Sequence, residues 1–172
     1  MERFGFIHDK LDLKILILFI LRRLPDAIDR EALSELVMQD EGVGYFDYTD
    51  CLDELAETGH VVSTEEGYRI TEKGDRNGFA IESSLPYTVR TRVERAITPV
   101  VNAMNRNAMI KTEHSPRPDG GFQVELAMGD GLGEIISLRL LAASEEQARE
   151  MEVNFRAEAE NFYNRVVKML TK

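Results

Sequence analysis

Apolar residues recur every three or four positions in three successive segments of the first half of the chain, which predicts three amphipathic helices. The segments cover residues 9–24, 28–39 and 47–58. Asp9, Asp29 and Asp47 stand where N-caps are expected, because a short side-chain oxygen can accept hydrogen bonds from the free backbone N–H groups there. Pro25 and Gly59 are typical of the positions that follow a helix.

The apolar pattern changes to short β-rich segments after the third helix. Residues 60–63 and 68–71 are predicted to pair as two strands, with the tetrapeptide TEEG at residues 64–67 as the turn. Three helices and a β-hairpin within about 70 residues are typical of a winged helix-turn-helix domain. We assign this domain to residues 1–84 and expect residues 71–83 to form a short helix or an irregular connector.

The second half opens with a long apolar stripe after Leu85, which predicts a helix with a kink at Pro99. Three segments of alternating apolar residues follow, separated by glycine-rich turns: residues 108–114, 122–128 and 134–142. They predict a three-stranded antiparallel sheet with one apolar face. The capping-box sequence SEEQ at residues 144–147 then starts a helix that runs to about residue 170. The expected fold class is therefore α+β, with an N-terminal winged helix-turn-helix domain followed by a helix, a three-stranded antiparallel sheet and a long C-terminal helix in residues 85–172.

The apolar stripe of the final helix has two interpretations. In the first it covers the apolar face of the sheet, and in the second it forms the contact between two copies of the chain. The two are compatible if the stripe is wide enough, and a regulator that reads a two-fold DNA site needs a dimer. A small-molecule pocket between the kinked helix and the sheet is a further alternative, for which the sequence indicates no ligand. We therefore expect a homodimer whose second domain serves dimerisation or sensing.

Charge is distributed unevenly along the chain. Residues 1–85 contain 9 Lys and Arg against 19 Asp and Glu, whereas residues 86–172 contain 12 of each. An acidic first half opposes non-specific binding to phosphates. The single cysteine, Cys51, excludes an internal disulfide framework and fits a cytoplasmic protein. The apolar run ILILFIL is shorter than the roughly 20 residues that span a bilayer, and no signal-peptide cleavage site follows it, so no membrane partner is expected.

Little in the sequence indicates catalysis. His8, His60 and His114 are far apart, and no phosphate-binding loop, nucleophile elbow or paired-ligand metal motif occurs. The segment GDGLG at residues 129–133 joins two strands, whereas phosphate-binding loops lead into a helix. Cys51 falls on the apolar stripe of the third helix, where a core thiol is expected. We therefore expect a non-enzymatic protein with no catalytic site, cofactor or bound metal.

Several segments, taken in their order, carry a family resemblance. They are LKILILFILRRL, GYFDYTDCLDELAETGHV, YRITEKG, SEEQARE and NFYNRVVKML. In this combination the chain resembles the domain of unknown function 4364 family, whose members look like winged-helix transcriptional regulators. The resemblance covers nearly the whole chain and implies a DNA-binding-like first domain and an α+β second domain. It implies no ligand and no catalytic residue.

The outer face of the third helix is the candidate DNA-binding surface, and its charge is unusual for that role. Between Tyr45 and Gly59 there is no Lys or Arg, whereas there are five acids: Asp47, Asp50, Asp53, Glu54 and Glu57. In one interpretation Tyr45, Thr49, Asp50 and Asp53 contact DNA, since carboxylates can accept from cytosine N4 and threonine can contact either kind of base. Phosphates must then be bound by cations outside the helix: Arg22, Arg23, Arg30, Arg69, Lys73 and Arg76. In the other interpretation the face is solvated or binds a basic protein partner.

Taken together, these patterns predict a cytoplasmic transcriptional regulator that binds DNA as a homodimer. The alternative is a non-enzymatic protein–protein interaction module in which the acidic winged helix no longer binds DNA. Fold alone does not separate the two functions.

Overall fold

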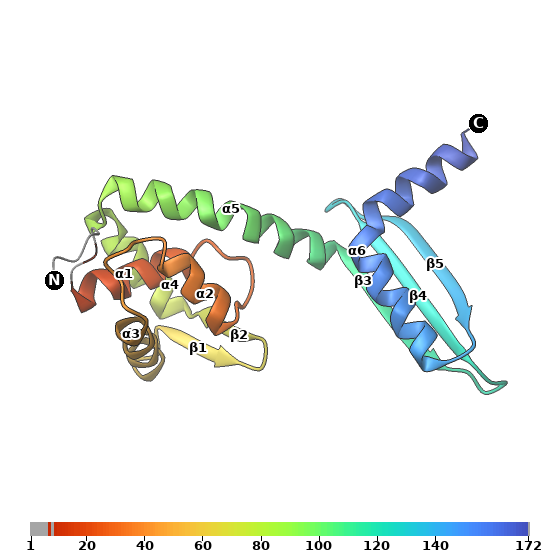
Figure 1. Cartoon of the computed structure of the whole chain (residues 1–172), viewed down its shortest axis with the longest axis horizontal. Coiled ribbons are helices and arrows are strands. Elements are labelled where there is room, and N and C mark those ends of the chain that lie inside the picture. The colour runs from red at the N-terminus through yellow and green to blue at the C-terminus, as the bar shows by residue number, and fades with distance from the viewer. Residues whose placement is uncertain (1–6, 8, 172) are drawn as a thin grey trace. The chain divides into compact units, whose positions relative to one another are not determined.

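The computed structural model describes residue 7 and residues 9–171, and the chain divides into two units, Met1–Met104 and Asn105–Lys172. The elements of the first unit are α1 (Lys10–Leu21), α2 (Arg30–Val37), α3 (Tyr45–Glu57), β1 (Val61–Thr64), β2 (Gly67–Ile70), α4 (Glu72–Ile81), a 3-10 turn (Glu82–Ser84) and most of α5 (Tyr87–Met109). The second unit contains β3 (Ile110–Pro116), β4 (Phe122–Gly129), β5 (Glu134–Ala142) and α6 (Glu145–Leu170). Figure 1 shows these elements along the chain. The α+β class is confirmed, with six helices, a two-stranded sheet and a three-stranded sheet in the described part of the chain.

Helix α1 is the centre of the first core. The Asp9 side chain caps it by accepting from the backbone N–H of Asp12 at 2.7 Å, as predicted. Every residue from Ile15 to Leu21 is buried, because α2, α3 and α4 pack around this wholly apolar part of the helix. The helix ends at Leu21, three residues before the predicted end. The next residues close a tighter turn, in which the Leu24 N–H bonds to the Leu21 carbonyl at 3.3 Å.

The predicted hairpin forms, with Thr64 opposite Gly67 across a two-residue turn. Backbone bonds also join the hairpin to the segment before α2, since Ile28 and Tyr68 donate to each other's carbonyls at 3.0 and 2.7 Å. Gly67 permits this close approach. It has a φ of +124°, and a Cβ there would lie 2.2 Å from the Ile28 carbonyl oxygen. The hairpin is thus held beside the start of α2.

The start of α3 differs from the prediction. The helix begins at Tyr45, and its N-cap is Gly44, whose carbonyl accepts from the Tyr48 N–H at 3.0 Å. The assignment of Asp47 as the N-cap was therefore wrong. The chain turns into the helix at Gly44, so the first turn already includes Tyr45 and Phe46. Asp47 instead stands within that first turn, where a negative charge interacts favourably with the helix dipole.

Helix α5 belongs mostly to the first unit. Its residues Val89, Val93 and Ile97 are buried in the same core as α1, and the structural division falls after Met104. The predicted boundary at residue 84 lies 20 residues earlier than this division. The physical reason is packing: Leu85 starts no separate unit, because its own side chain is buried in the first core too.

In the second unit the three strands pair in the order β3–β4–β5, all antiparallel, as predicted. Helix α6 lies across one face of this sheet (Figure 1). The core between them consists mainly of Val124, Leu126 and Met128 from β4 and Phe155 and Ala159 from α6. The remaining core residues are Ile110, Ala142 and Ala148.

Ser144 caps α6 as predicted, and the capping box differs from the expected form only in that Ala143, not Ser144, is the backbone donor to Gln147. Ser144 Oγ accepts from the Gln147 N–H at 3.2 Å, and Gln147 Oε1 accepts in return from the Ala143 N–H at 2.7 Å. The helix does not continue straight to its end. Glu158 has non-helical angles, φ −125° and ψ 15°, so α6 consists of two helical segments joined at a kink.

Candidate nucleic-acid interface

Helix α3 divides cleanly into a buried and an outward face. Tyr48, Cys51, Leu52 and Leu55 are buried, as the apolar spacing predicts. The Tyr48 hydroxyl donates to the Arg30 carbonyl at 2.9 Å, and burial raises the pKa of this phenol, which keeps it neutral. Burial likewise raises the pKa of the Cys51 thiol, whose side chain is fully buried. This favours a structural thiol on the inner face of α3.

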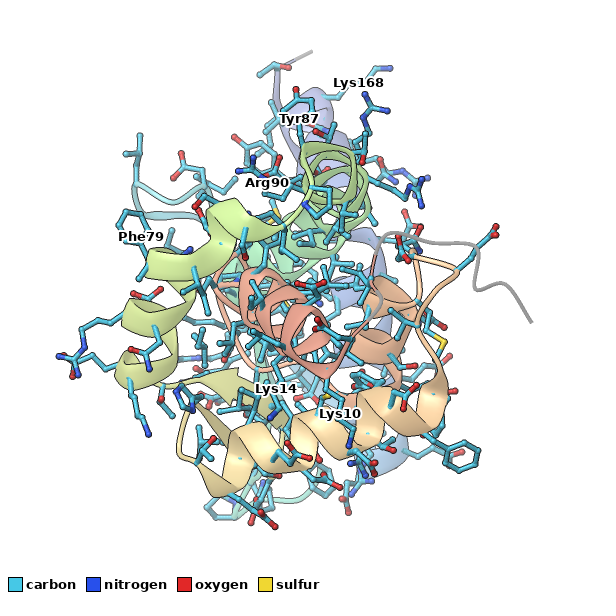
Figure 2. All side chains as sticks on the ribbon, turned by 90° about the vertical axis from the view of Figure 1, so that its left-hand side faces the viewer. Lys10, Lys14, Phe79, Tyr87, Arg90 and Lys168 are labelled. Carbon is cyan, nitrogen blue, oxygen red and sulfur yellow. The ribbon has the colours of Figure 1, made fainter. Side chains whose placement is uncertain are left out.

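Two lysines of α1 pair with the acids of α3. Lys10 Nζ lies 3.3 Å from an Asp50 carboxylate oxygen and 3.5 Å from one of Glu54, and Lys14 Nζ lies 2.5 Å from the other Glu54 oxygen. Figure 2 shows Lys10 and Lys14 extending from α1 to α3. The hydrogen bond to Asp50 raises the pKa of Lys10, and the hydrogen bond from Lys14 lowers the pKa of Glu54. The Lys10 ammonium and the Glu54 carboxylate therefore stay charged near neutral pH.

Arg30 pairs with a third acid of α3. Its Nη2 lies 2.6 Å from Asp53 Oδ1, and its guanidinium carbon lies 5.8 Å from the centre of the Tyr68 ring in the hairpin. Arg30, which was predicted to bind phosphate, thus lies between α2, α3 and β2. Asp50, Asp53 and Glu54 each have a cationic partner, so much of the negative charge on this helix is compensated within the fold.

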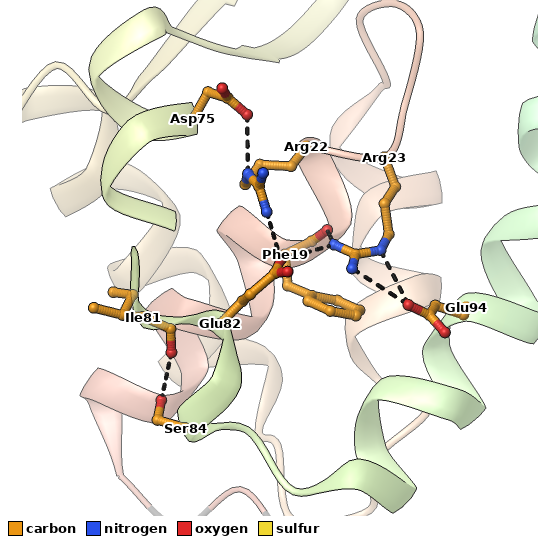
Figure 3. A network of polar contacts seen from close by, with 8 residues as sticks. All are labelled: Phe19, Arg22, Arg23, Asp75, Ile81, Glu82, Ser84 and Glu94. Carbon is orange, nitrogen blue, oxygen red and sulfur yellow. Dashed lines mark hydrogen bonds and ion pairs between the residues drawn. The ribbon is translucent and has the colours of Figure 1, made fainter. Parts of the chain in front are cut away.

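Arg22 and Arg23, which were also predicted to bind phosphates, lie elsewhere and form ion pairs within the fold (Figure 3). Arg22 contacts Glu82 through an ion pair and Asp75 through a second one at 2.9 Å. Arg23 pairs with Glu82 at 3.2 Å and with Glu94 at 3.3 Å. The two side chains are only 15% and 27% exposed. They join the end of α1 to α4, the 3-10 turn and α5, so binding a phosphate would break pairs that hold the fold together.

The cations near the hairpin are more accessible. Arg69 on β2 is half exposed and forms an ion pair with Asp26. The pKa of the Asp26 carboxyl is lowered, first by the bond from the Ala27 N–H and then by Arg69. Lys73 Nζ donates to the Thr58 carbonyl at 2.6 Å, at the C-terminal end of α3, where a cation interacts favourably with the helix dipole. Arg76, 70% exposed, pairs with Glu72 within α4 at 3.2 Å.

The N-terminal end of α3 exposes two aromatic rings. Phe46 is 83% and Tyr45 is 52% exposed, and their ring centres lie 6.3 Å apart in an edge-on arrangement. Thr49 is half-buried, and its hydroxyl donates to the Phe46 carbonyl at 2.9 Å. The sequence-based set of site residues missed Phe46. It also missed Lys10 and Lys14, although two lysines four positions apart lie on the same face of a helix.

The histidines in the described ranges bond to neighbouring side chains within the fold. Among the described residues, no group of three or more His, Cys, Asp or Glu side chains is placed to hold a metal ion. His60 bonds with Thr58 and Asn77 at 2.9 Å each, and His114 contacts Glu152 at 3.1 Å. No helix in the described ranges is both long and apolar enough to cross a bilayer.

Comparison with known proteins gives one match. Residues 13–170 match a family model described as Domain of unknown function (DUF4364). The comparisons with curated proteins and with solved structures find nothing that matches.

Proposed function

The chain belongs to the DUF4364 family, and from this premise we propose that it is a non-enzymatic transcriptional regulator that binds DNA through α3 and the β1–β2 hairpin. The arrangement of the first unit supports a winged helix-turn-helix assignment. Three helices precede the hairpin, and the Ile28–Tyr68 bonds hold the hairpin beside α2. In winged helices the third helix enters the major groove while the hairpin lies against the flanking backbone.

The observation that carries the proposal is the pairing of acids on α3 with cations from neighbouring helices. An unpaired acidic helix would be repelled by phosphates, but Asp50, Asp53 and Glu54 hold Lys10, Lys14 and Arg30 at the borders of the outer face. Lys10 and Arg30, whose side chains are 52% and 40% exposed, are available to the phosphates on either side of a groove. The same acids orient the cations, since each bond restricts a long and otherwise mobile side chain.

The exposed end of α3 supplies groups suited to base edges. The Phe46 and Tyr45 rings can contact thymine methyl groups, and Asp50 and Asp53 can accept from cytosine N4. Thr49 can contact either kind of base. Arg69 and Lys73 then stand on the hairpin side as phosphate contacts. In this proposal the second unit supplies dimerisation or sensing, which places two such helices on a two-fold site.

A duplex titration at low and at physiological salt tests the proposal. We expect Lys10→Gln and Arg69→Gln each to weaken binding to all sequences and to reduce the salt dependence by about one unit per lost phosphate contact. Lys111→Gln, in an exposed position of β3 outside the interface, is the matched control and leaves binding unchanged. Asp53→Asn combined with Glu57→Gln should raise non-specific affinity, because two negative charges leave the surface and Arg30 is released toward phosphate.

A second candidate function is a docking surface for a basic protein partner. Phe46 is unusually exposed for an aromatic residue, and the hairpin tip carries two further acids, Glu65 and Glu66. Large exposed apolar groups within a polar border are typical of protein contact sites. If neither the wild type nor the doubly neutralised protein binds any duplex at low salt, the DNA proposal fails and this candidate replaces it.

A further inference from the structure

The C-terminal segment of α6, after the kink at Glu158, leaves much of its apolar surface uncovered. Met169 is 72% and Leu170 is 79% exposed, and Phe162 and Val167 are each 38% exposed. Phe162, Val166, Met169 and Leu170 recur at the spacing of one helical face. The buried α6 residues are Ala148, Phe155 and Ala159, and after the kink only Tyr163 among the described residues still packs in part against the same core.

A groove that is also mainly apolar lies beside the kink of the same helix. It has a volume of about 360 Å³ and is lined by Leu126 and Leu140 from the sheet and by Met151, Phe155 and Phe162 from α6. Asn154 and Glu158 complete its border. An uncovered apolar helix face and an uncovered apolar groove therefore occur together in this unit. Burial of either by another chain would contribute favourable free energy.

The charges along α6 identify what fits the groove. Before the kink, residues 145–157 carry four Glu and two Arg, a balance of −2, whereas after it residues 159–170 carry Arg165, Lys168 and one acid, Glu160, a balance of +1. A second copy of the helix is complementary only in the antiparallel direction, in which each basic segment meets an acidic one. A parallel pair would place acid against acid and base against base.

The lengths of the two segments agree with this pairing. Thirteen residues precede the kink in α6 and twelve follow it, which at a rise of about 1.5 Å per residue gives segments of roughly 20 and 18 Å. We propose that two copies associate antiparallel through α6, with the C-terminal segment of each in the groove of the other and the two-fold axis near Glu158. Such an isologous contact buries both uncovered surfaces at once and closes the assembly at two chains.

Charge reversal tests whether α6 forms the contact between copies and whether the two helices pair in the antiparallel direction. Arg165→Glu with Lys168→Glu makes both segments acidic, and Glu146→Lys with Glu150→Lys makes both basic. We expect each double variant to dimerise about tenfold more weakly or worse, because like charges then face each other. All four substitutions in one chain should restore the dimer, and mixing the two double variants should give a heterodimer. Sedimentation equilibrium measures this against the chain mass of 19.6 kDa.

Two leucines provide a matched control for the apolar part of the contact. Leu170→Asp should weaken the dimer, whereas Leu132→Asp in the β4–β5 turn, where the side chain is 97% exposed, should leave it unchanged. Cysteine cross-linking tests the axis, since Cys51 is fully buried and should not interfere. Glu158→Cys should form a disulfide between copies under mild oxidation, and Leu170→Cys should not, because an antiparallel pair separates the two helix ends.

Several results would overturn the proposal. They are a wild-type mass of one chain at micromolar concentrations, a dimer that both double variants leave unaffected, a four-fold variant that stays dissociated, and a disulfide at position 170 instead of 158. Far-ultraviolet circular dichroism of each variant shows that it is folded. The dimer rests on the proposed function, in which the second unit supplies dimerisation, but its test measures mass and not DNA binding. A dimer that binds no duplex would reject the regulator and keep this contact, and a monomer that binds a duplex would do the opposite.

Discussion

Helices α1 and α6 both carry apolar residues, but the chain covers only one of them. α1 is 12 residues long and buried continuously from Ile15 to Leu21 by neighbours from the same unit. α6 is 26 residues long and has Ala148, Phe155 and Ala159 as its buried residues. The first unit therefore completes its own core, whereas the second leaves an apolar segment uncovered. A covered helix accounts for stability, and an uncovered one indicates a partner.

The largest effect expected from this comparison comes from one substitution made in both helices. Leu16→Ala should lower the free energy of unfolding by about 2–5 kcal/mol, because a fully buried side chain leaves a cavity. Leu170→Ala should change it by about 0.5 kcal/mol or less in the dissociated chain, because the side chain is already in water. Urea unfolding followed by circular dichroism measures both. A large loss from Leu170→Ala at the lowest protein concentration would mean that the chain itself covers this segment.

The dependence of stability on protein concentration gives a second test of the difference between α1 and α6. Association adds to the apparent stability by mass action. The destabilisation caused by Leu170→Ala should therefore grow as the protein concentration rises, while that caused by Leu16→Ala should stay constant. Equal behaviour of the two variants across concentrations would contradict the difference between the helices.

Two glycines, one in each unit, should give the next largest difference. A Cβ on Gly74 would lie 2.0 Å from the His60 carbonyl oxygen, where α4 starts against the end of α3, so backbone must move. We expect Gly74→Ala to cost about 1–3 kcal/mol. A Cβ on Gly133 meets no described atom within 4 Å, and Gly133→Ala should be neutral to within about 0.5 kcal/mol. Thermal unfolding of the two variants compares them directly.

The ion pairs of α3 should matter less for stability than for binding. Asp53→Asn removes the partner of Arg30 at an exposed position, so we expect a loss of only about 0–1 kcal/mol. High salt should abolish even that loss. A cost well above this range in urea unfolding would assign the pair a structural role like that of the more buried Arg22–Glu82 pair.

The smallest effect expected is a pH dependence at the junction of α3, β1 and α4. Burial, followed by the nearby Lys73, lowers the pKa of His60 below its ordinary value of 6.5. Between the lowered pKa and 6.5 the unfolded chain binds more protons than the folded chain, so the free energy of unfolding rises with pH through this window. This contribution is fully present above 6.5 and is lost as the pH falls through the folded pKa. His60→Asn should flatten the profile there, and an unchanged slope would exclude His60 as its source.

Some features of the candidate site followed from local pattern, and others did not. The Asp9 and Asp29 caps, the buried stripe of α3 and the hairpin turn depend on neighbours within a few residues, which is why the sequence predicts them. The prediction of Asp47 as the N-cap of α3 was wrong because the chain direction at Gly44 is set by the preceding loop, which packs against other elements. The positions of Arg22 and Arg23 depend on Glu82 and Glu94, about 60 and 70 residues further along the chain.

By itself, the sequence determined the order and type of the elements, because hydrophobic period and capping act over a few residues. It also determined the acidic outer face of α3 and the opposite charges of the two α6 segments, since composition does not depend on folding. Only the tertiary structure decided that Lys10, Lys14 and Arg30 compensate the acids of α3, and that α5 completes the first core. The tertiary structure also decided that α6 extends beyond the sheet against which it packs. Ion pairing, core membership and coverage are properties of residues brought together from distant positions, and chain order alone does not contain those distances.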